Sequence, residues 1–186
     1  MEDNSTTTQG QGLFQHAIRF GAILGGIGIL ITVLLYVADF TLLADWKFGI
    51  GMLLLYLGLV IYAGINYRNQ IGGYLAYGKA FQHGYVTLVV GGLVGTIFGI
   101  LLYTVIDPDL PQALADVTVE KTGEMMKKFG APEDQIEEQL DKMRVDLPKQ
   151  FSALGSIKQF GWGLIINAVI SAITSLFVRK NQPEIM

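Results

Sequence analysis

Four long stretches of the chain carry no charged residue, and they constrain the fold more than any other feature. They cover residues 20–38, 48–67, 84–106 and 159–178, with 19 to 23 residues in each. A helix rises about 1.5 Å per residue, so about 20 apolar residues cross the hydrocarbon core of a bilayer. Lipid offers no partner for backbone N–H and C=O groups, so a stretch that crosses it must be helical even when it is rich in glycine. The sequence therefore predicts four transmembrane helices.

The rest of the composition fits an integral membrane protein and excludes several kinds of site. Of the 186 residues 51% are hydrophobic, and the net charge of −3 gives no reason to expect binding to nucleic acid. The absence of cysteine excludes disulfides, thiolate catalysis and cysteine-ligated metal centres. We expect no cofactor. We expect a membrane domain over residues 16–182, a disordered N-terminal tail over 1–15 and a short C-terminal tail over 183–186.

The four predicted spans read as one two-helix unit written twice. At an offset of 67 residues Phe14-Gln15-His16 recurs as Phe81-Gln82-His83, and at an offset of 112 Arg68-Asn69 is matched by Lys180-Asn181. Any two membrane helices share Leu and Gly by composition, so only the polar and aromatic matches at the span boundaries count as evidence. Similarity of that kind at a fixed offset indicates a repeat. The predicted fold is an all-α membrane protein of two tandem helical hairpins, related by parallel duplication, with an amphipathic helical hairpin between the third and fourth membrane helices.

Basic residues near the predicted helix ends set the expected orientation. Arg19, Arg68, Lys79, Arg179 and Lys180 lie on the side that also carries both termini. The positive-inside rule places this side in the cytoplasm. We therefore expect a multi-pass inner-membrane protein with cytoplasmic termini and an extracytoplasmic segment over residues 107–158.

Small residues recur at four-residue spacing along three of the predicted spans. In lipid, close approach of helix backbones through such residues is a main source of helix association. We therefore predict helix packing at Gly21 and Gly25 in the first span, at Gly91, Gly95 and Gly99 in the third, and at Gly163, Asn167, Ser171 and Ser175 in the fourth, with Thr174 beside them.

The amide and hydroxyl groups of the fourth span admit a second interpretation. Four-residue spacing puts them on one side of the helix, and an unpaired Asn167 amide in lipid costs on the order of a few kcal/mol. This face should therefore turn inward, where it either hydrogen-bonds between helices or lines a polar binding site or permeation path. Hydrogen bonding is the more usual role, since true pathways usually add an ionisable residue.

The sequence of residues 107–158 predicts the amphipathic helical hairpin. Asp109 is the expected N-cap of its first helix, with Pro111 in the first turn. Gly130 suits the left-handed position after that helix, and Pro148 is expected to end the second helix. An apolar stripe on the second helix must be buried against the first helix, the membrane surface or another subunit; its members are Ile136, Leu140, Met143 and Leu147. The opposite face carries Glu133, Glu137, Glu138 and Asp141, which is typical of a solvated surface and less often of a cation site.

His16 and His83 occupy equivalent positions in the predicted repeat. They could pair near the inner interface as a proton or metal site. Without a Glu or Cys companion, ordinary interfacial polar residues are the more usual interpretation.

Four short motifs, in order and spacing, resemble one bacterial family of four-span membrane proteins, domain of unknown function 4199. They are Phe-Gly-Ala-Ile-Leu-Gly at 20–25, Tyr-Gly-Lys-Ala-Phe-Gln-His-Gly at 77–84, the segment 103–108, and Phe-Gly-Ala-Pro-Glu-Asp-Gln-Ile-Glu at 129–137. The resemblance implies an integral membrane protein and no known activity.

Function follows from these observations mostly by exclusion. We expect that the protein is not an enzyme, because acid, base or nucleophile groups are not positioned together. The leading hypothesis is a non-enzymatic protein-interaction or assembly component in the lipid bilayer, with a protein partner or a second copy of the chain. The alternative is a small transporter or channel subunit that acts as a homo-oligomer around the polar stripe of the fourth span.

Overall fold

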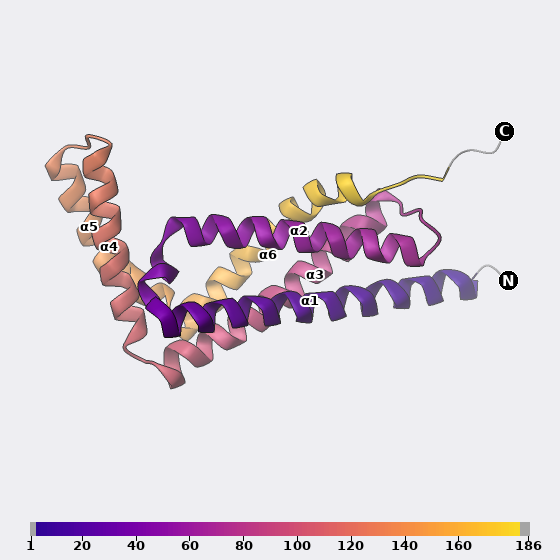
Figure 1. The fold of residues 1–186 in the computed structure, drawn as a ribbon, viewed down its shortest axis with the longest axis horizontal. Helices are drawn as coiled ribbons and strands as arrows, with labels where there is room; N and C mark the ends of the chain where they lie inside the picture. The colour runs from indigo at the N-terminus through magenta and orange to yellow at the C-terminus, as the bar shows by residue number, and fades with distance from the viewer. Residues whose placement is uncertain (1–2, 183–186) are drawn as a thin grey trace. The chain divides into compact units, whose positions relative to one another are not determined.

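The computed structural model describes residues 3–182, and they form an all-α chain. A 3-10 helix, η1 (Phe40–Ala44), follows the first helix, and a π-helical turn, η2 (Leu102–Ile106), follows the third. The α-helices, coloured in chain order in Figure 1, are α1 (Asp3–Asp39), α2 (Trp46–Gln70), α3 (Tyr77–Leu101), α4 (Leu110–Lys128), α5 (Glu133–Gln150) and α6 (Ala153–Val178).

Within the described part of the chain, four helical stretches are long and apolar enough to cross a membrane. They are Gly12–Ala44, Trp46–Gln70, Tyr77–Ile106 and Ala153–Val178. Each contains one of the four predicted spans, so the predicted helices are confirmed as four candidate membrane spans. Large apolar side chains such as Leu34, Val37 and Leu54 are exposed along these stretches, which favours contact with lipid tails rather than with water. The parallel duplication stays a prediction.

Helix α1 begins at Asp3, so most of the segment 1–15 that was predicted to be disordered is helical. Once the apolar part has nucleated a helix, each further residue adds a hydrogen bond at little cost. The polar Thr and Gln residues therefore extend it toward the N-terminus. Residues 1–2 of the predicted N-terminal tail, and the predicted C-terminal tail at 183–186, lie outside the described residues.

The chain divides into two compact units, and each of the four candidate spans contributes to both. Unit 1 contains the described residues up to Gly28, Met52–Gly95, and those from Trp162 onward. Unit 2 contains Ile29–Gly51 and Thr96–Gly161. The two units are described separately below.

Unit 1 is closed at one end by contacts between chain segments far apart in sequence. Leu75, in the connection between α2 and α3, exchanges both backbone hydrogen bonds with Lys180 at 2.9 Å. Arg68 Nη1 donates to the Val178 carbonyl at 2.8 Å, where a cation satisfies an end of α6 that lacks intrahelical partners. The connection between α2 and α3 and the end of α6 therefore lie on the same side of this unit.

The interior of unit 1 consists of two small apolar clusters. One surrounds Tyr67, Leu75 and Val178, and the other contains Leu24, Val60 and Leu88. The clusters join all four candidate spans, because the partly buried Ile170 of α6 packs on the second of them.

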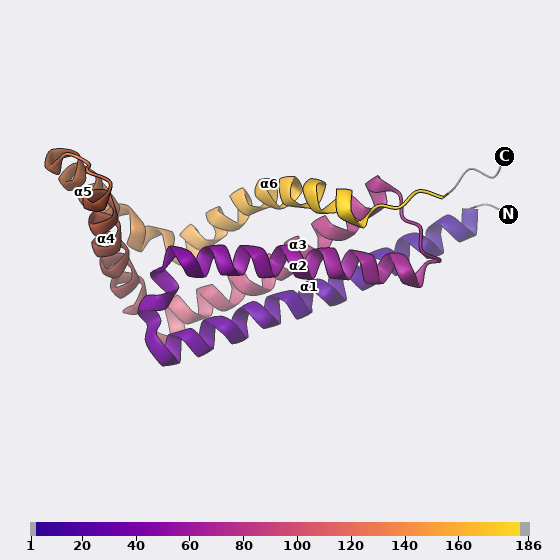
Figure 2. The same ribbon diagram turned by 45° about the horizontal axis from the view of Figure 1, so that its top comes forward.

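Unit 2 contains the predicted helical hairpin, in which α4 and α5 lie side by side in both views (Figures 1 and 2). Gly130 has φ of +75°, and the Gly130 and Ala131 amides donate to the carbonyls of Lys127 and Met126 at 3.0 and 3.1 Å. This is the Schellman arrangement, and it confirms the predicted left-handed glycine. The apolar stripe of α5 is its least exposed face, with Ile136 fully buried.

Two details of the hairpin differ from the prediction. The side chain of Asp109 makes no capping bond; instead Asp107 Oδ1 accepts from the amides of Asp109 and Leu110 at 3.2 and 3.1 Å. Helix α5 also continues past Pro148 to Gln150. A proline this near the C-terminus removes one intrahelical bond, and the last turn tolerates that loss more readily than a helix centre does.

Candidate functional site

A pair of histidines lies inside unit 1, joined by a short hydrogen bond. His16 of α1 and His83 of α3 approach with 2.9 Å between Nδ1 and Nε2. His16 Nε2 lies 3.1 Å from Asn66 Oδ1 of α2, and that oxygen also accepts from Gln70 Nε2 at 2.7 Å. The pairing proposed from the repeat is therefore present. Among the described residues, three or more His, Cys, Asp or Glu side chains nowhere come together as a metal-binding group.

The hydrogen bonds fix the tautomers of the pair. Asn66 Oδ1 can only accept, so His16 Nε2 carries a proton. With His16 neutral, its Nδ1 accepts from His83 Nε2–H, and His83 Nδ1 is left as a buried acceptor without a partner among the described residues. A charged His16 would instead leave a buried His83 donor unpaired beside a half-buried charge, which costs more. The favoured state is two neutral rings linked in series to Asn66.

Aromatic rings enclose both histidines. Tyr67 stacks on His83 with 5.2 Å between ring centroids and 17° between planes, and Phe20 stacks on His16 at 4.5 Å. His83 is completely buried. The arrangement can pass a proton between imidazoles, and because His83 is completely buried, only the half-buried His16 is within reach of a ligand.

The polar stripe of α6 is largely satisfied by backbone carbonyls. Ser171 Oγ donates to the Phe81 carbonyl at 2.8 Å, and both Ser175 Oγ and Thr174 Oγ1 donate to the Ser171 carbonyl. All three hydroxyl residues are buried. Asn167 and Gly163 are half-buried, and in the described part of the chain the Asn167 amide has no hydrogen-bond partner.

The glycine stripes are used unequally. A Cβ on Gly21 would lie 2.7 Å from the Thr87 carbonyl oxygen, and a Cβ on Gly25 would lie 2.7 Å from Val94 Cβ, so α1 and α3 approach closely here. Gly91 faces α1 across the same contact. Gly95 and Gly99 have no such neighbour: within 4 Å, a Cβ on Gly95 would meet no atom of the described residues, and one on Gly99 would meet only Tyr103.

Sequence reasoning missed several functional contacts of unit 1. Asn66 bonds His16 across 50 residues, and its only sequence signal was a polar side chain near the end of a span. Gly64 and Gly84 also lie at close helix contacts, against Val178 and Ser171. Neither glycine belonged to a four-residue stripe, so the pattern that predicted Gly21 and Gly25 could not find them.

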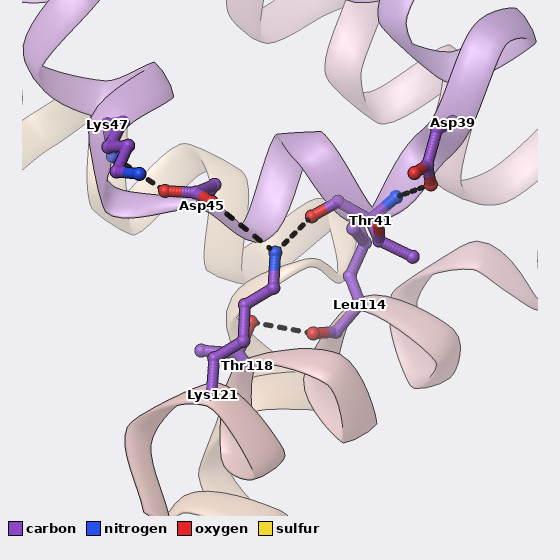
Figure 3. A network of polar contacts seen from close by, with 7 residues as sticks. All are labelled: Asp39, Thr41, Asp45, Lys47, Leu114, Thr118 and Lys121. Carbon is purple, nitrogen blue, oxygen red and sulfur yellow. Dashed lines mark hydrogen bonds and ion pairs between the residues drawn. The ribbon is translucent and has the colours of Figure 1, made fainter. Parts of the chain in front are cut away.

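Unit 2 holds a second polar site, centred on Lys121 of α4. Figure 3 shows its ammonium group between the Thr41 carbonyl and the Asp45 carboxylate. Lys121 Nζ donates to Thr41 O at 2.8 Å and lies 3.8 Å from Asp45 Oδ2. Asp45 Oδ1 accepts from the Lys47 amide at 2.9 Å. The network ties α4 to the turn between η1 and α2.

A cavity of about 910 Å³ opens beside this network. Its walls come from the turn between η1 and α2, from α4 and from the ends of the two hairpin helices. Its aromatic and long apolar side chains are Leu43, Trp46, Phe48, Tyr103, Leu114, Met125, Phe129 and Phe151, and its charged groups are Asp45, Lys47, Lys121, Glu124 and Lys128. No sequence pattern pointed to this cavity, because its walls are far apart in the chain.

The described residues therefore define a helical protein with four candidate membrane spans and an additional helical hairpin. The chain belongs to DUF4199, a family of proteins of unknown function, and the match covers residues 19–180. This confirms the resemblance seen in the short motifs. No curated protein and no solved structure matches the chain.

Proposed function

We propose that the chain is a non-enzymatic, multi-pass component of the bacterial inner membrane that acts by binding, and that the cavity of unit 2 is its binding site. The basic residues near the helix ends, such as Arg68 and Lys180, support cytoplasmic termini. In this orientation the α4–α5 hairpin and the cavity face the extracytoplasmic side.

The cavity is the observation that carries this proposal. Its volume of about 910 Å³ lies in the range of roughly 300–1,000 Å³ that is usual for ligand sites. The apolar stripe of α5 is already partly covered, because Ile136 is buried and Leu140 packs on Gly123 of α4. Large aromatic groups nevertheless stay accessible at the cavity, with Trp46 65% and Phe129 84% exposed. Accessible apolar groups around a hollow mark an interaction site.

The walls of the cavity are held in place before anything binds. Leu102, Leu110 and Leu114 form a buried cluster on which Phe40, Tyr103 and Phe151 pack. Tyr36 donates to Asp107 Oδ2 at 2.9 Å, and Lys121 fixes α4 to the turn at Thr41. Such preorganisation lowers the entropy cost of binding.

Native mass spectrometry of the protein released from membranes tests the proposal. Thr122 lines the cavity, whereas Glu120 lies on the exposed side of the same helix. We expect wild type and Glu120→Phe to retain a bound species, and Thr122→Phe to lose it because phenylalanine fills the site. A protein that carries no bound species, or an equal load on Thr122→Phe, would contradict the proposal.

The mass of the retained species also separates two forms of the binding role. A second copy of the chain or another protein supports the assembly role, in which unit 2 receives part of a partner protein. A small molecule supports a ligand-binding role at the same cavity.

The histidine pair favours one alternative function, a small transporter or channel subunit. Two neutral imidazoles linked to Asn66 offer a path for protons between three helices. In proteoliposomes with an imposed pH gradient, this alternative predicts proton flux that His16→Phe abolishes. For the stripe of α6, loss of solute flux in Asn167→Ala/Ser171→Ala with the assembly intact would favour transport. Unchanged flux with altered complex recovery would favour the binding role.

A further inference from the structure

We propose that the cavity of unit 2 binds a single-chain anionic amphiphile, of the class of long-chain carboxylic acids. This inference rests on the proposed function and names the ligand of the same site. Three features of the cavity lead to it: its position along the candidate spans, its apolar walls and its uncompensated positive charge.

The cavity lies where candidate membrane spans end. Trp46 is the first residue of the span Trp46–Gln70, Leu43 is next to the last residue of Gly12–Ala44, and Tyr103 lies three residues before the end of Tyr77–Ile106. The opposite wall is α4, which is not a candidate span. A site at this level is open to molecules that gather at the membrane interface, and those molecules are amphiphiles.

The walls provide an apolar surface for a chain. Phe48, Met125 and Phe151 line the cavity together with the exposed rings of Trp46 and Phe129. Each methylene group that such walls remove from water adds to the affinity for a chain. A cavity of about 910 Å³ is of the size that takes one drug-sized ligand, so we infer one chain rather than the two chains of a phospholipid.

The charges of the cavity favour an anionic headgroup. Lys121 and Asp45 compensate each other; Lys121 also donates to the Thr41 carbonyl of η1, and Asp45 accepts from the Lys47 amide of α2. Within residues 3–182, the remaining lining charges, Lys47, Lys128 and Glu124, form no ion pair with any described residue. Two ammonium groups against one carboxylate leave a net positive charge. A carboxylate headgroup satisfies it through charge-assisted hydrogen bonds.

Tryptophan fluorescence provides the test, because the chain has two tryptophans and only Trp46 lines the cavity. In the full-length protein, Trp162→Phe leaves Trp46 as the sole reporter, and Trp46→Phe leaves the exposed Trp162 as the control. The detergent-solubilised proteins are titrated with 9,10-dibromostearic acid, whose bromines quench nearby indole. We expect saturable quenching of Trp46 and weak, non-saturating quenching of Trp162.

The headgroup preference is tested by two comparisons. The methyl ester of the same acid should bind at least about tenfold more weakly, which corresponds to about 1.4 kcal/mol. In the Trp46 reporter, Lys47→Gln/Lys128→Gln should weaken binding of the acid by a similar factor and leave the ester unchanged. The matched control is Lys142→Gln/Lys149→Gln, which removes two exposed ammonium groups of α5 and should leave binding of the acid unchanged.

Several outcomes would overturn this ligand. Equal affinity for the acid and the ester, or unchanged affinity for the acid in Lys47→Gln/Lys128→Gln, would contradict the preference for an anionic headgroup. Equal quenching of Trp46 and Trp162 would show general partitioning into the micelle. Retention of a protein or another class of molecule in the mass measurement would also overturn it, while the proposed binding function would stand. A protein that carries no bound species in that measurement would instead contradict the proposed function itself.

Discussion

Replacement of Gly21 by alanine should separate α1 from α3 and destabilise unit 1. The new Cβ would lie 2.7 Å from the Thr87 carbonyl oxygen and 2.7 Å from Val90 Cβ, whereas ordinary contact begins at 3.4 Å. The first neighbour is backbone and the second is branched directly at its Cβ, so neither can turn aside. Overpacking of this kind typically costs about 1–3 kcal/mol.

Gly26→Ala is the matched control in the same helix. A Cβ on Gly26 would meet no described atom within 4 Å. Both changes alter helix propensity by the same amount, up to about 1 kcal/mol in favour of alanine in water. Their difference therefore isolates the packing cost, and we expect Gly21→Ala to be less stable than Gly26→Ala by about 1–3 kcal/mol.

Equilibrium unfolding in mixed micelles measures this difference. The purified proteins are titrated with sodium dodecyl sulfate, and the free energy of unfolding is obtained from the transition of each variant. Gly25→Ala should behave like Gly21→Ala, because its Cβ would also come within 2.7 Å of Val94. Equal stabilities of Gly21→Ala and Gly26→Ala would refute the close approach of α1 and α3.

Further variants test three other contacts, the first two by the same unfolding assay and the third by amide exchange. His16→Leu leaves the buried donor of His83 without an acceptor and should lower the free energy of unfolding by about 1–3 kcal/mol. The double variant His16→Leu/His83→Leu should lose less stability than the sum of the two single changes. Additive losses would argue against the pair. Arg68→Met removes the hydrogen bond to the Val178 carbonyl and should cost about 1.5–3 kcal/mol, so wild-type stability would show that this end of α6 is satisfied otherwise. Gly130→Ala forces alanine to a φ of +75°, which should lower the stability of the hairpin by about 1–2 kcal/mol. We expect faster amide exchange confined to α4 and α5. Unchanged exchange would contradict the left-handed turn.

The features that could be predicted from the sequence are local. An uncharged stretch of about 20 residues needs no distant partner to be recognised as a span. The turn at Gly130 was signalled by one glycine and the Pro132 that follows, and the buried stripe of α5 by its helical spacing. The contact between His16 and His83 was one of the two interpretations that the recurring Phe-Gln-His motif suggested.

The features that could not be predicted depend on tertiary distances. Asn66 is one of several polar residues near a helix end, and only the folded chain brings it to His16. Lys121 looked like a basic residue of an exposed helix, although it bonds Thr41 across 80 residues. Asp107 and Asp109 both suit a cap by composition, and the backbone path decides in favour of Asp107. The cavity combines walls from several helices, so no single segment carries its signature.

Cysteine labelling of intact cells tests most directly whether unit 2 presents its binding site outside a membrane that the chain crosses four times. The native chain has no cysteine, so Glu137→Cys in α5 and Asn69→Cys at the end of α2 each place one thiol at an exposed position. With an impermeant maleimide added outside, residue 137 should react at once, and residue 69 only after the membrane is opened. Labelling of residue 69 in intact cells, with residue 137 protected, would invert the orientation and contradict an extracytoplasmic binding site.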